Sequence, residues 1–130
     1  MRRLASAVAV AGLLALMLAP AATAASNPFA GVWTSTDLFD GSTQMLVVSG
    51  GSAPAVTYQD SYAQTCANNG SGSTHWVANG RGEIQEYGML VDFRFGGCGS
   101  YRWVDGYPAW LYFDSGTLMD NFGNVWHRFP

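Results

Sequence analysis

The chain contains no lysine, and only 12% of its 130 residues are charged. The absence of lysine excludes Schiff-base chemistry and a lysine nucleophile. Apart from Arg2 and Arg3, four arginines face nine acidic residues, so the remaining chain has a net charge near −5. That balance argues against a nucleic-acid partner, which selects for basic patches, and against binding to an anionic membrane surface.

Cysteine and histidine are also scarce, with two residues of each. In an oxidising compartment, an even cysteine count indicates a disulfide, and Cys66 with Cys98 is the single pairing possible. A metal site or a redox pair is the alternative, but the chain has neither a CxxC motif nor a histidine cluster. We therefore predict one disulfide, no metal and no cofactor.

The first 24 residues have the pattern of a secretory signal peptide. A basic start, Met1-Arg2-Arg3, precedes an apolar run over residues 4–19, and Ala22-Thr23-Ala24 provides small residues for cleavage. The run is shorter than the roughly 20 residues that a membrane anchor requires. We expect residues 1–24 to be removed, leaving residues 25–130 as a single secreted, extracellular domain that is not bound to a membrane.

Sustained helical periodicity is missing from this domain, and glycine or proline interrupts almost every segment. Short runs of β-branched and aromatic residues recur between polar turns, which is typical of all-β proteins. Short connections favour antiparallel neighbours, so we predict an up-and-down meander that closes into a small barrel. An open two-sheet sandwich is the alternative. The eight predicted strands cover residues 30–36, 43–49, 55–62, 74–82, 88–95, 109–113, 117–120 and 124–129.

The connections and strand faces follow from the same pattern. We expect a polar loop over residues 63–73, a turn near 83–87 and an irregular segment over 96–108. Alternation predicts that Met89, Val91, Phe93 and Phe95 face one way and that Asp92 and Arg94 face the other. Which of these two faces lines the barrel stays open at this point. In the third strand, one face carries Val56, Tyr58, Asp60 and Tyr62.

Gly31-Val32-Trp33 in the first strand and Arg128 after the last strand together resemble the lipocalin (calycin) pattern. The resemblance implies a barrel in which Trp33 closes one end and Arg128 stacks across it. The first hairpin, with its Gly41-Ser42 turn, is also similar to that of avidin-type biotin binders. The interval from Trp33 to Ser42 is longer than in avidins, and the later tryptophans do not match the biotin contacts. The resemblance therefore implies the architecture and the Trp33–Arg128 closure, but not biotin binding.

Motifs for catalysis are weak. Asp114-Ser115-Gly116-Thr117 resembles the aspartic-protease motif, but that chemistry needs two such aspartates, so a hairpin turn is the preferred interpretation. His75 and His127 have no partner at a useful spacing. The Asp-rich turns at 37–41 and 120–124 match no calcium-binding loop.

The remaining feature is aromatic content, with eighteen Phe, Tyr and Trp residues. Aromatic side chains interleaved with a few polar groups suit a small-ligand pocket or a protein-binding surface. We predict a non-enzymatic binding module for a small apolar or amphipathic ligand. The alternative is a module that binds an extracellular protein, such as a protease inhibitor presenting residues 96–108; a hydrolase is the least favoured hypothesis. The candidate ligand contacts are Tyr58, Trp76, Phe93, Trp103, Tyr107 and Trp110.

Overall fold

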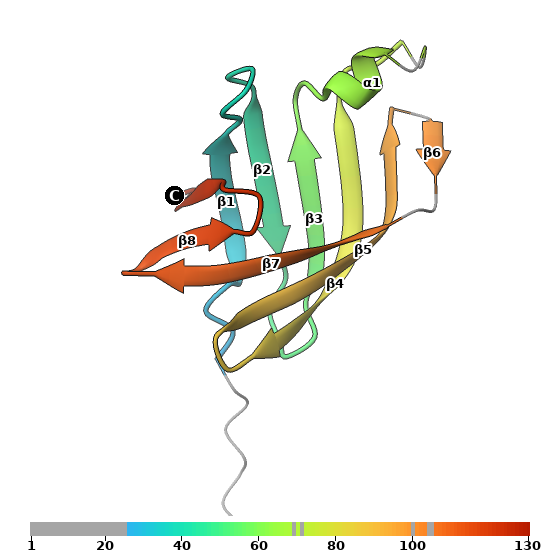
Figure 1. Ribbon diagram of the computed structural model, residues 1–130. Helices are drawn as coiled ribbons and strands as arrows, with labels where there is room; N and C mark the ends of the chain where they lie inside the picture. Colours follow the sequence, from blue (N-terminus) through green and yellow to red (C-terminus); the bar gives the residue numbers. More distant parts are fainter. Residues whose placement is uncertain (1–25, 69, 71, 100, 104–105) are drawn as a thin grey trace, which may run out of the picture.

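Nine strands and one short helix make up the structure, which is a computed structural model (Figure 1). It describes residues 26–68, 70, 72–99, 101–103 and 106–130, and for 101–103 the backbone alone. The predicted signal peptide lies outside the described residues. The elements are β1 Gly31–Thr36, β2 Thr43–Val48, β3 Ala55–Asp60, α1 Gln64–Asn68, β4 Trp76–Gln85, β5 Gly88–Cys98, β6 Tyr101–Trp103, β7 Tyr107–Asp114, β8 Thr117–Asp120 and β9 Val125–Arg128.

Eight of these strands form a closed antiparallel barrel. The hydrogen-bonded order is β4-β3-β2-β1-β9-β8-β7-β5, and β5 pairs again with β4 to complete the ring. The N-terminal and C-terminal strands meet directly, because Trp33 pairs with Arg128 and Thr34 with His127. The prediction of a small up-and-down barrel is confirmed, and the alternative of an open sandwich is wrong.

The core lies inside the ring and follows the alternation of the strands. Inward residues are buried and their neighbours face outward, as the period of two in a β-strand requires. The buried hydrophobic cluster consists of Phe29, Trp33, Leu46, Val48, Val56, Ala78, Met89, Val91, Phe93, Ala109, Leu111, Leu118 and Trp126.

A β-bulge in the β4–β5 hairpin reverses the predicted orientation of Phe95. Asn79 pairs with Phe95 and Gly80 with Phe93, which leaves Arg94 as the extra residue in β5. The extra residue reverses the alternation beyond it, so Phe95 is 59% exposed whereas Phe93 is buried. The prediction that Phe95 faces the same way as Phe93 is therefore wrong.

The outer face of β5 carries its charged residues. Arg94 and Asp92 form an ion pair in which both side chains are at least half exposed. The alternative in which these two residues line the barrel is wrong, since Met89, Val91 and Phe93 occupy that position.

Three segments differ from the predicted connections. Helix α1 lies within the predicted polar loop, where five residues are too few to show a helical period. Strand β6 lies within the predicted irregular segment and extends the sheet beyond the ring by pairing with Gly96–Cys98. Strand β4 continues to Gln85 and strand β5 begins at Gly88. The expected turn near 83–87 is therefore confined to residues 86–87.

The Asp114-Ser115-Gly116-Thr117 segment is a hairpin turn between β7 and β8. Asp114 pairs with Thr117, and Ser115 and Gly116 both have positive φ values, 50° and 83°. Two positive φ angles in a two-residue turn match the twist of the flanking strands. This geometry confirms the hairpin interpretation of the motif.

The end of the barrel at which β1 begins and β9 ends, called the closed end below, is sealed by aromatic side chains. Arg128 lies over Trp33, with Cζ 4.2 Å from the ring centroid. The ring of Phe113 stacks on Phe29 at 5.2 Å and meets Trp33 edge-on at 6.1 Å. The arginine stacking that the lipocalin resemblance implies is thus present.

Hydrogen bonds hold this end in place. The indole Nε1 of Trp33 donates to the carbonyl of Phe29 at 2.8 Å. Arg128 donates to the carbonyls of Ala30 at 2.9 Å and Pro28 at 3.3 Å. Gly31 has φ +133°, and a Cβ atom there would come within 2.6 Å of the Arg128 guanidinium. Glycine at position 31 therefore makes room for the arginine.

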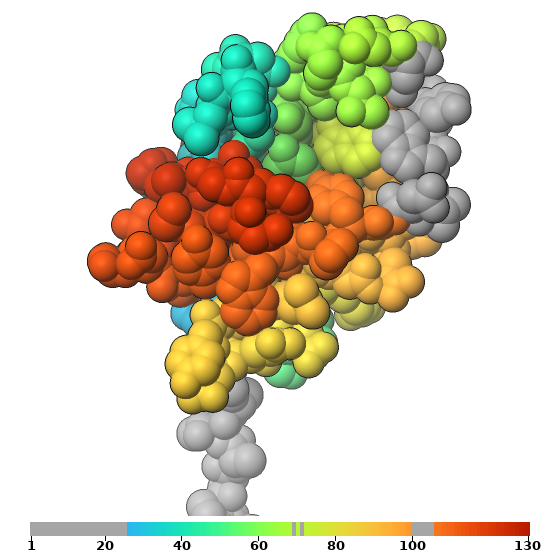
Figure 2. Space-filling view, in the orientation of Figure 1, coloured from blue at the N-terminus to red at the C-terminus, as the bar shows by residue number. Residues whose placement is uncertain are grey.

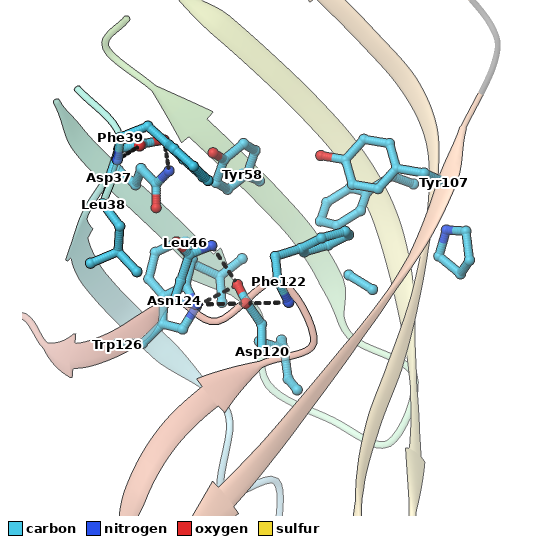
Figure 3. Close-up of a pocket in the computed structure, with 15 residues that line it drawn as sticks. Asp37, Leu38, Phe39, Leu46, Tyr58, Tyr107, Asp120, Phe122, Asn124 and Trp126 are labelled. Atoms are coloured by element: carbon cyan, nitrogen blue, oxygen red, sulfur yellow. Dashed lines mark hydrogen bonds between the residues drawn. The ribbon is translucent and has the colours of Figure 1, made fainter. Parts of the chain in front are cut away.

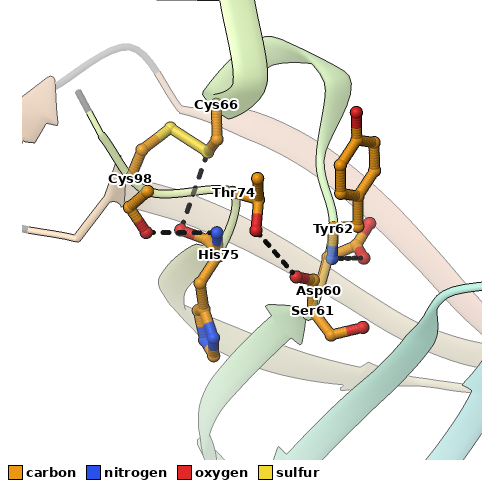
Figure 4. The surroundings of a disulfide bond; sticks show 8 residues. Asp60, Ser61, Tyr62, Cys66, Thr74, His75 and Cys98 are labelled. Atoms are coloured by element: carbon orange, nitrogen blue, oxygen red, sulfur yellow. Dashed lines mark hydrogen bonds between the residues drawn. A yellow bond between two sulfur atoms is a disulfide. The ribbon is translucent and has the colours of Figure 1, made fainter. Parts of the chain in front are cut away.

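The predicted disulfide joins α1 to the end of β5 near the opposite end of the barrel (Figure 4). Cys66 and Cys98 are both buried, with exposed fractions of 1% and 0%. The bond closes a segment with a sequence separation of 32. It fixes the short helix, which could not be stable by itself.

Reduction of the Cys66–Cys98 disulfide is expected to lower the melting temperature by more than about 10 °C. Closing a loop of this length stabilises a fold by about 3–4 kcal/mol on the chain-entropy model, and each kcal/mol shifts the midpoint by several degrees. Thermal unfolding followed by circular dichroism, with and without reductant, measures the shift. A Cys66→Ser/Cys98→Ser variant serves as a reductant-independent control, and an unchanged midpoint would contradict the stabilising role.

The Arg128→Ala substitution is expected to destabilise the protein by about 1–3 kcal/mol, because it removes both the stacking on Trp33 and the backbone hydrogen bonds. Arg128→Lys should lose most of the same free energy, since an ammonium cannot reproduce the planar fork. Urea unfolding measures both variants. Arg81→Ala is the control, because Arg81 is exposed and reaches only the Ala53 carbonyl at 3.5 Å. Equal stabilities of the Arg128→Ala and Arg81→Ala variants would contradict the closure.

Candidate ligand-binding cavity

The barrel interior is filled at the closed end and hollow towards the opposite end, called the open end below. The closed half contains Trp33, Val48, Met89, Val91 and Leu118, none of them more than 5% exposed. The open half contains a cavity of about 500 Å³ (Figure 3), within the usual range for small-molecule sites. It is lined by Asp37, Leu38, Phe39, Gln44, Leu46, Tyr58, Phe93, Tyr107, Pro108, Ala109, Leu111, Asp120, Phe122, Asn124 and Trp126.

Six of the fifteen residues that line the cavity are aromatic. A series of ring contacts runs across it: Trp126 to Tyr58 at 6.2 Å, Tyr58 to Phe93 at 6.4 Å and Phe93 to Tyr107 at 5.2 Å. These rings come from β9, β3, β5 and β7, so they face one another only because the sheet closes. Ala109 leaves space between Tyr107 and Leu111 on β7. The shape of the cavity therefore depends on one small residue among large ones.

Two turns form the rim of the cavity. The β1–β2 turn contributes Leu38 and Phe39, which are 77% and 98% exposed. The β8–β9 turn contributes Phe122, whose ring meets Tyr107 edge-on at 6.0 Å. Figure 2 shows the β1–β2 turn (teal) and the C-terminal strands (red) next to each other on this face. Exposed apolar side chains at a rim give an apolar molecule a surface to contact on entry.

Asp120 organises the β8–β9 turn. Its carboxylate accepts hydrogen bonds from the backbone N–H groups of Phe122 at 2.9 Å and Asn124 at 3.0 Å. It also accepts from Asn124 Nδ2 at 2.9 Å and from the indole Nε1 of Trp126 at 3.0 Å. The last bond fixes the orientation of the Trp126 ring against the cavity.

Asp60, at the end of β3, is buried and has a similar role. It accepts hydrogen bonds from the Ser42 hydroxyl at 2.9 Å, the Tyr62 N–H at 3.0 Å and the Tyr58 hydroxyl at 3.3 Å. These bonds connect the β1–β2 turn to β3 and hold the Tyr58 ring in the cavity wall.

Gln44 has an unpaired buried side-chain atom among the described residues. It is 2% exposed, and its Nε2 donates to Asp37 Oδ2 at 2.9 Å. Its Oε1 has no hydrogen-bond partner in the described part of the chain. An unpaired buried acceptor costs about 1–3 kcal/mol. The oxygen is itself buried, so this cost is internal to the fold.

Burial is the main cause that raises the pKa of Tyr58 far above its ordinary value of 10.0, and the Asp60 carboxylate raises it further. Burial also raises the pKa of Tyr107, as do the more distant Asp120 and Asp60, although a hydrogen bond with Trp76 acts in the opposite direction. Both phenols therefore keep their protons at neutral pH.

The structure brings together three of the six predicted ligand contacts. Tyr58, Phe93 and Tyr107 line the cavity. Trp76 packs against the core beside it. Trp110 lies on the outer face of β7, between the inward-facing Ala109 and Leu111, and does not line the cavity. The side chain of Trp103 lies outside the described residues.

Sequence reasoning missed several lining residues. Gln44 alternates with Leu46 and Val48 on one strand face, so a polar residue at a core position could have been noticed. Trp126 is flanked by exposed residues in β9 and could have been assigned inward in the same way. The contributions of Leu38 and Phe122 come from turns, whose positions alternation does not predict.

The described ranges give little evidence for a metal site or for a site built on histidine. They contain no group of three or more His, Cys, Asp or Glu side chains arranged to hold a metal ion. His75 and His127 are exposed and do not line the cavity. In the same ranges, no helix has the length and apolar content needed to span a membrane.

No protein-family model, curated protein or solved structure matches this chain. The chemistry of the cavity is therefore the basis for the functional proposal.

In alkaline titration, Tyr58 and Tyr107 are expected to stay protonated until the protein unfolds. Their raised pKa values mean that, above about pH 10, the unfolded chain loses protons that the folded protein retains, so the free energy of unfolding falls as pH rises. Tyrosinate absorbance and circular dichroism, measured together, test this. Tyr58→Phe should reduce the alkaline loss of stability, and Tyr87→Phe, at a position 79% exposed, should not. Ionisation of all tyrosines near pH 10 in a folded protein would contradict the assignment.

Proposed function

We propose that this protein is a secreted, non-enzymatic barrel that binds a small amphipathic molecule in the open half of its interior. The observation that carries the proposal is the cavity of about 500 Å³, which is walled by aromatic rings and open at one end. Apolar walls with a few oriented polar groups are typical of small-molecule sites. The apolar body of the ligand would contact Tyr58, Phe93 and Trp126, and its polar end would lie near the rim.

Two further features support parts of this proposal. The disulfide is compatible with an extracellular location, and residues 1–24 have the signal-peptide pattern described above. A binding role is preferred to catalysis because the carboxylates of Asp60 and Asp120 are occupied by hydrogen bonds within the fold. The relationship to lipocalins and avidins, and the alternative of a protein-binding module, stay hypotheses.

The proposal predicts that a neutral hydrophobic probe, N-phenyl-1-naphthylamine, becomes fluorescent on binding to the purified protein. Ala109→Trp should abolish the enhancement, because an indole at this position would fill the cavity. Ala109→Leu should weaken it in proportion to the smaller volume added. Fluorescence titration measures binding, and circular dichroism confirms that each variant is folded.

Ala55→Trp is the matched control, because Ala55 is exposed on the outside of β3. It should bind the probe like the original protein. No enhancement with the original protein, or equal enhancement with folded Ala109→Trp, would contradict binding in the cavity.

A further inference from the structure

Two consecutive apolar side chains lie exposed at the tip of the β1–β2 turn. Leu38 is 77% exposed and Phe39 is 98% exposed. In Figure 1 this turn projects beyond the ends of β1 and β2, away from the closed end of the barrel. Apolar side chains that gather in water at one place mark a surface that another molecule or phase covers. The tip of this turn is therefore a candidate docking surface.

The backbone of the turn is hydrogen-bonded within the turn itself. The N–H of Phe39 donates to Asp37 Oδ1 at 2.7 Å, and the N–H of Ser42 donates to Asp40 Oδ1 at 2.8 Å. The N–H of Asp37 donates to the carbonyl of Ser42 at 2.9 Å, and that of Gly41 to the carbonyl of Asp37 at 3.0 Å. An apolar medium requires backbone groups to be paired internally. These four N–H groups would therefore keep their partners if the tip left water.

The exposed tip is continuous with the mouth of the cavity. Leu38 and Phe39 line the cavity as well as the surface, and so does Phe122 of the β8–β9 turn, which is 57% exposed. The two turns lie next to each other in Figure 2. A surface that covered Leu38 and Phe39 would therefore lie at the entrance through which a ligand reaches the aromatic walls.

Charge restricts what can cover the tip. Asp37 and Asp40 flank the two apolar residues, and the turn over residues 37–42 contains no basic residue. Arg94 pairs with Asp92 on the outer face, and Arg128 lies at the closed end. An anionic lipid surface would be repelled, and two copies meeting tip to tip would bring like charges together. A zwitterionic lipid surface has no net charge and carries its cationic groups outermost, so it meets neither objection.

From these observations we infer that the β1–β2 turn docks on a zwitterionic lipid surface, with Leu38 and Phe39 inserted among the lipids and the cavity mouth beside them. Lipid needs no complementary shape, which suits a convex tip, whereas the dominant residues of protein interfaces are mostly Trp, Tyr and Arg. The contact is peripheral and reversible, because two inserted side chains bury far less apolar area than a membrane anchor. Docking itself needs no ligand; uptake of an amphipathic ligand from the lipid rests on the proposed function.

The first test places an indole at the tip and measures whether it enters lipid. The Phe39→Trp variant is mixed with vesicles of phosphatidylcholine brominated on the acyl chains, which quench an indole that reaches the apolar layer. We expect quenching beyond that of the original protein. Tyr87→Trp is the matched control, because Tyr87 is 79% exposed in the β4–β5 turn at the other end of the barrel; its added indole should not be quenched. Quenching of both added indoles, or of neither, would overturn the inference.

The second test removes the apolar tip. A Leu38→Ser/Phe39→Ser variant should bind dioleoylphosphatidylcholine vesicles at least about tenfold more weakly than the original protein in a sedimentation assay, because both inserted side chains are lost. Tyr87→Ser should bind within about twofold of the original protein, because position 87 does not contact the lipid. Circular dichroism confirms that each variant is folded. Equal binding of the two folded variants would overturn the assignment of the docking surface.

Lipid composition and self-association separate lipid from other occupants. Replacing part of the phosphatidylcholine by phosphatidylglycerol should weaken binding, since like charges repel; stronger binding would overturn the zwitterionic assignment. A dimer of the original protein that the Leu38→Ser/Phe39→Ser variant lacks, measured by analytical ultracentrifugation without lipid, would assign the tip to a second copy and overturn the inference. No binding to phosphatidylcholine vesicles would overturn docking and leave the proposed function standing. Failure of N-phenyl-1-naphthylamine to bind would overturn the proposed function and leave docking standing.

Discussion

The pairing of β1 with β9 is the contact on which the rest of the structure depends. It brings Trp33 opposite Arg128 and allows the guanidinium to cover the indole while donating to two backbone carbonyls. Joining these strands closes the ring and fixes its circumference at eight strands, a size that side chains or one small ligand can fill. Every other feature of the interior is set by how those eight inward faces are occupied.

Large side chains fill one half of this interior and leave the other half open. Around Trp33 the rings of Phe29 and Phe113 form an aromatic layer, whereas Ala109 and the turns at the rim leave space near Tyr58. The polar groups follow the same division. The aspartates and Gln44 lie at the open end, where the aspartate carboxylates organise the turns. One end of the barrel therefore provides stability, and the other is available to recognise a ligand.

The sequence predicted the parts that depend on alternation and pairing. These are the eight strands of the ring, the Cys66–Cys98 bond and, through the lipocalin resemblance, the position of Arg128. It did not predict the bulge at Arg94, because one extra residue in a strand leaves no mark in the pattern. Phe95 was consequently assigned to the same strand face as Phe93. Helix α1 is too short to show a period, since the disulfide and not its own sequence stabilises it. Tyr58, Phe93 and Tyr107 were selected as aromatic candidates. Gln44 and Trp126 were missed because a site formed across six strands depends on which residues face one another after closure.

The barrel is sealed at the Trp33 end, and we propose that it holds a ligand at the other. A crystal structure of the protein grown with N-phenyl-1-naphthylamine tests this arrangement most directly. The predicted result is a naphthyl ring between Tyr58, Phe93 and Trp126, and Arg128 stacked on Trp33. A structure in which side chains fill the open half, or in which Arg128 is turned away from Trp33, would contradict it.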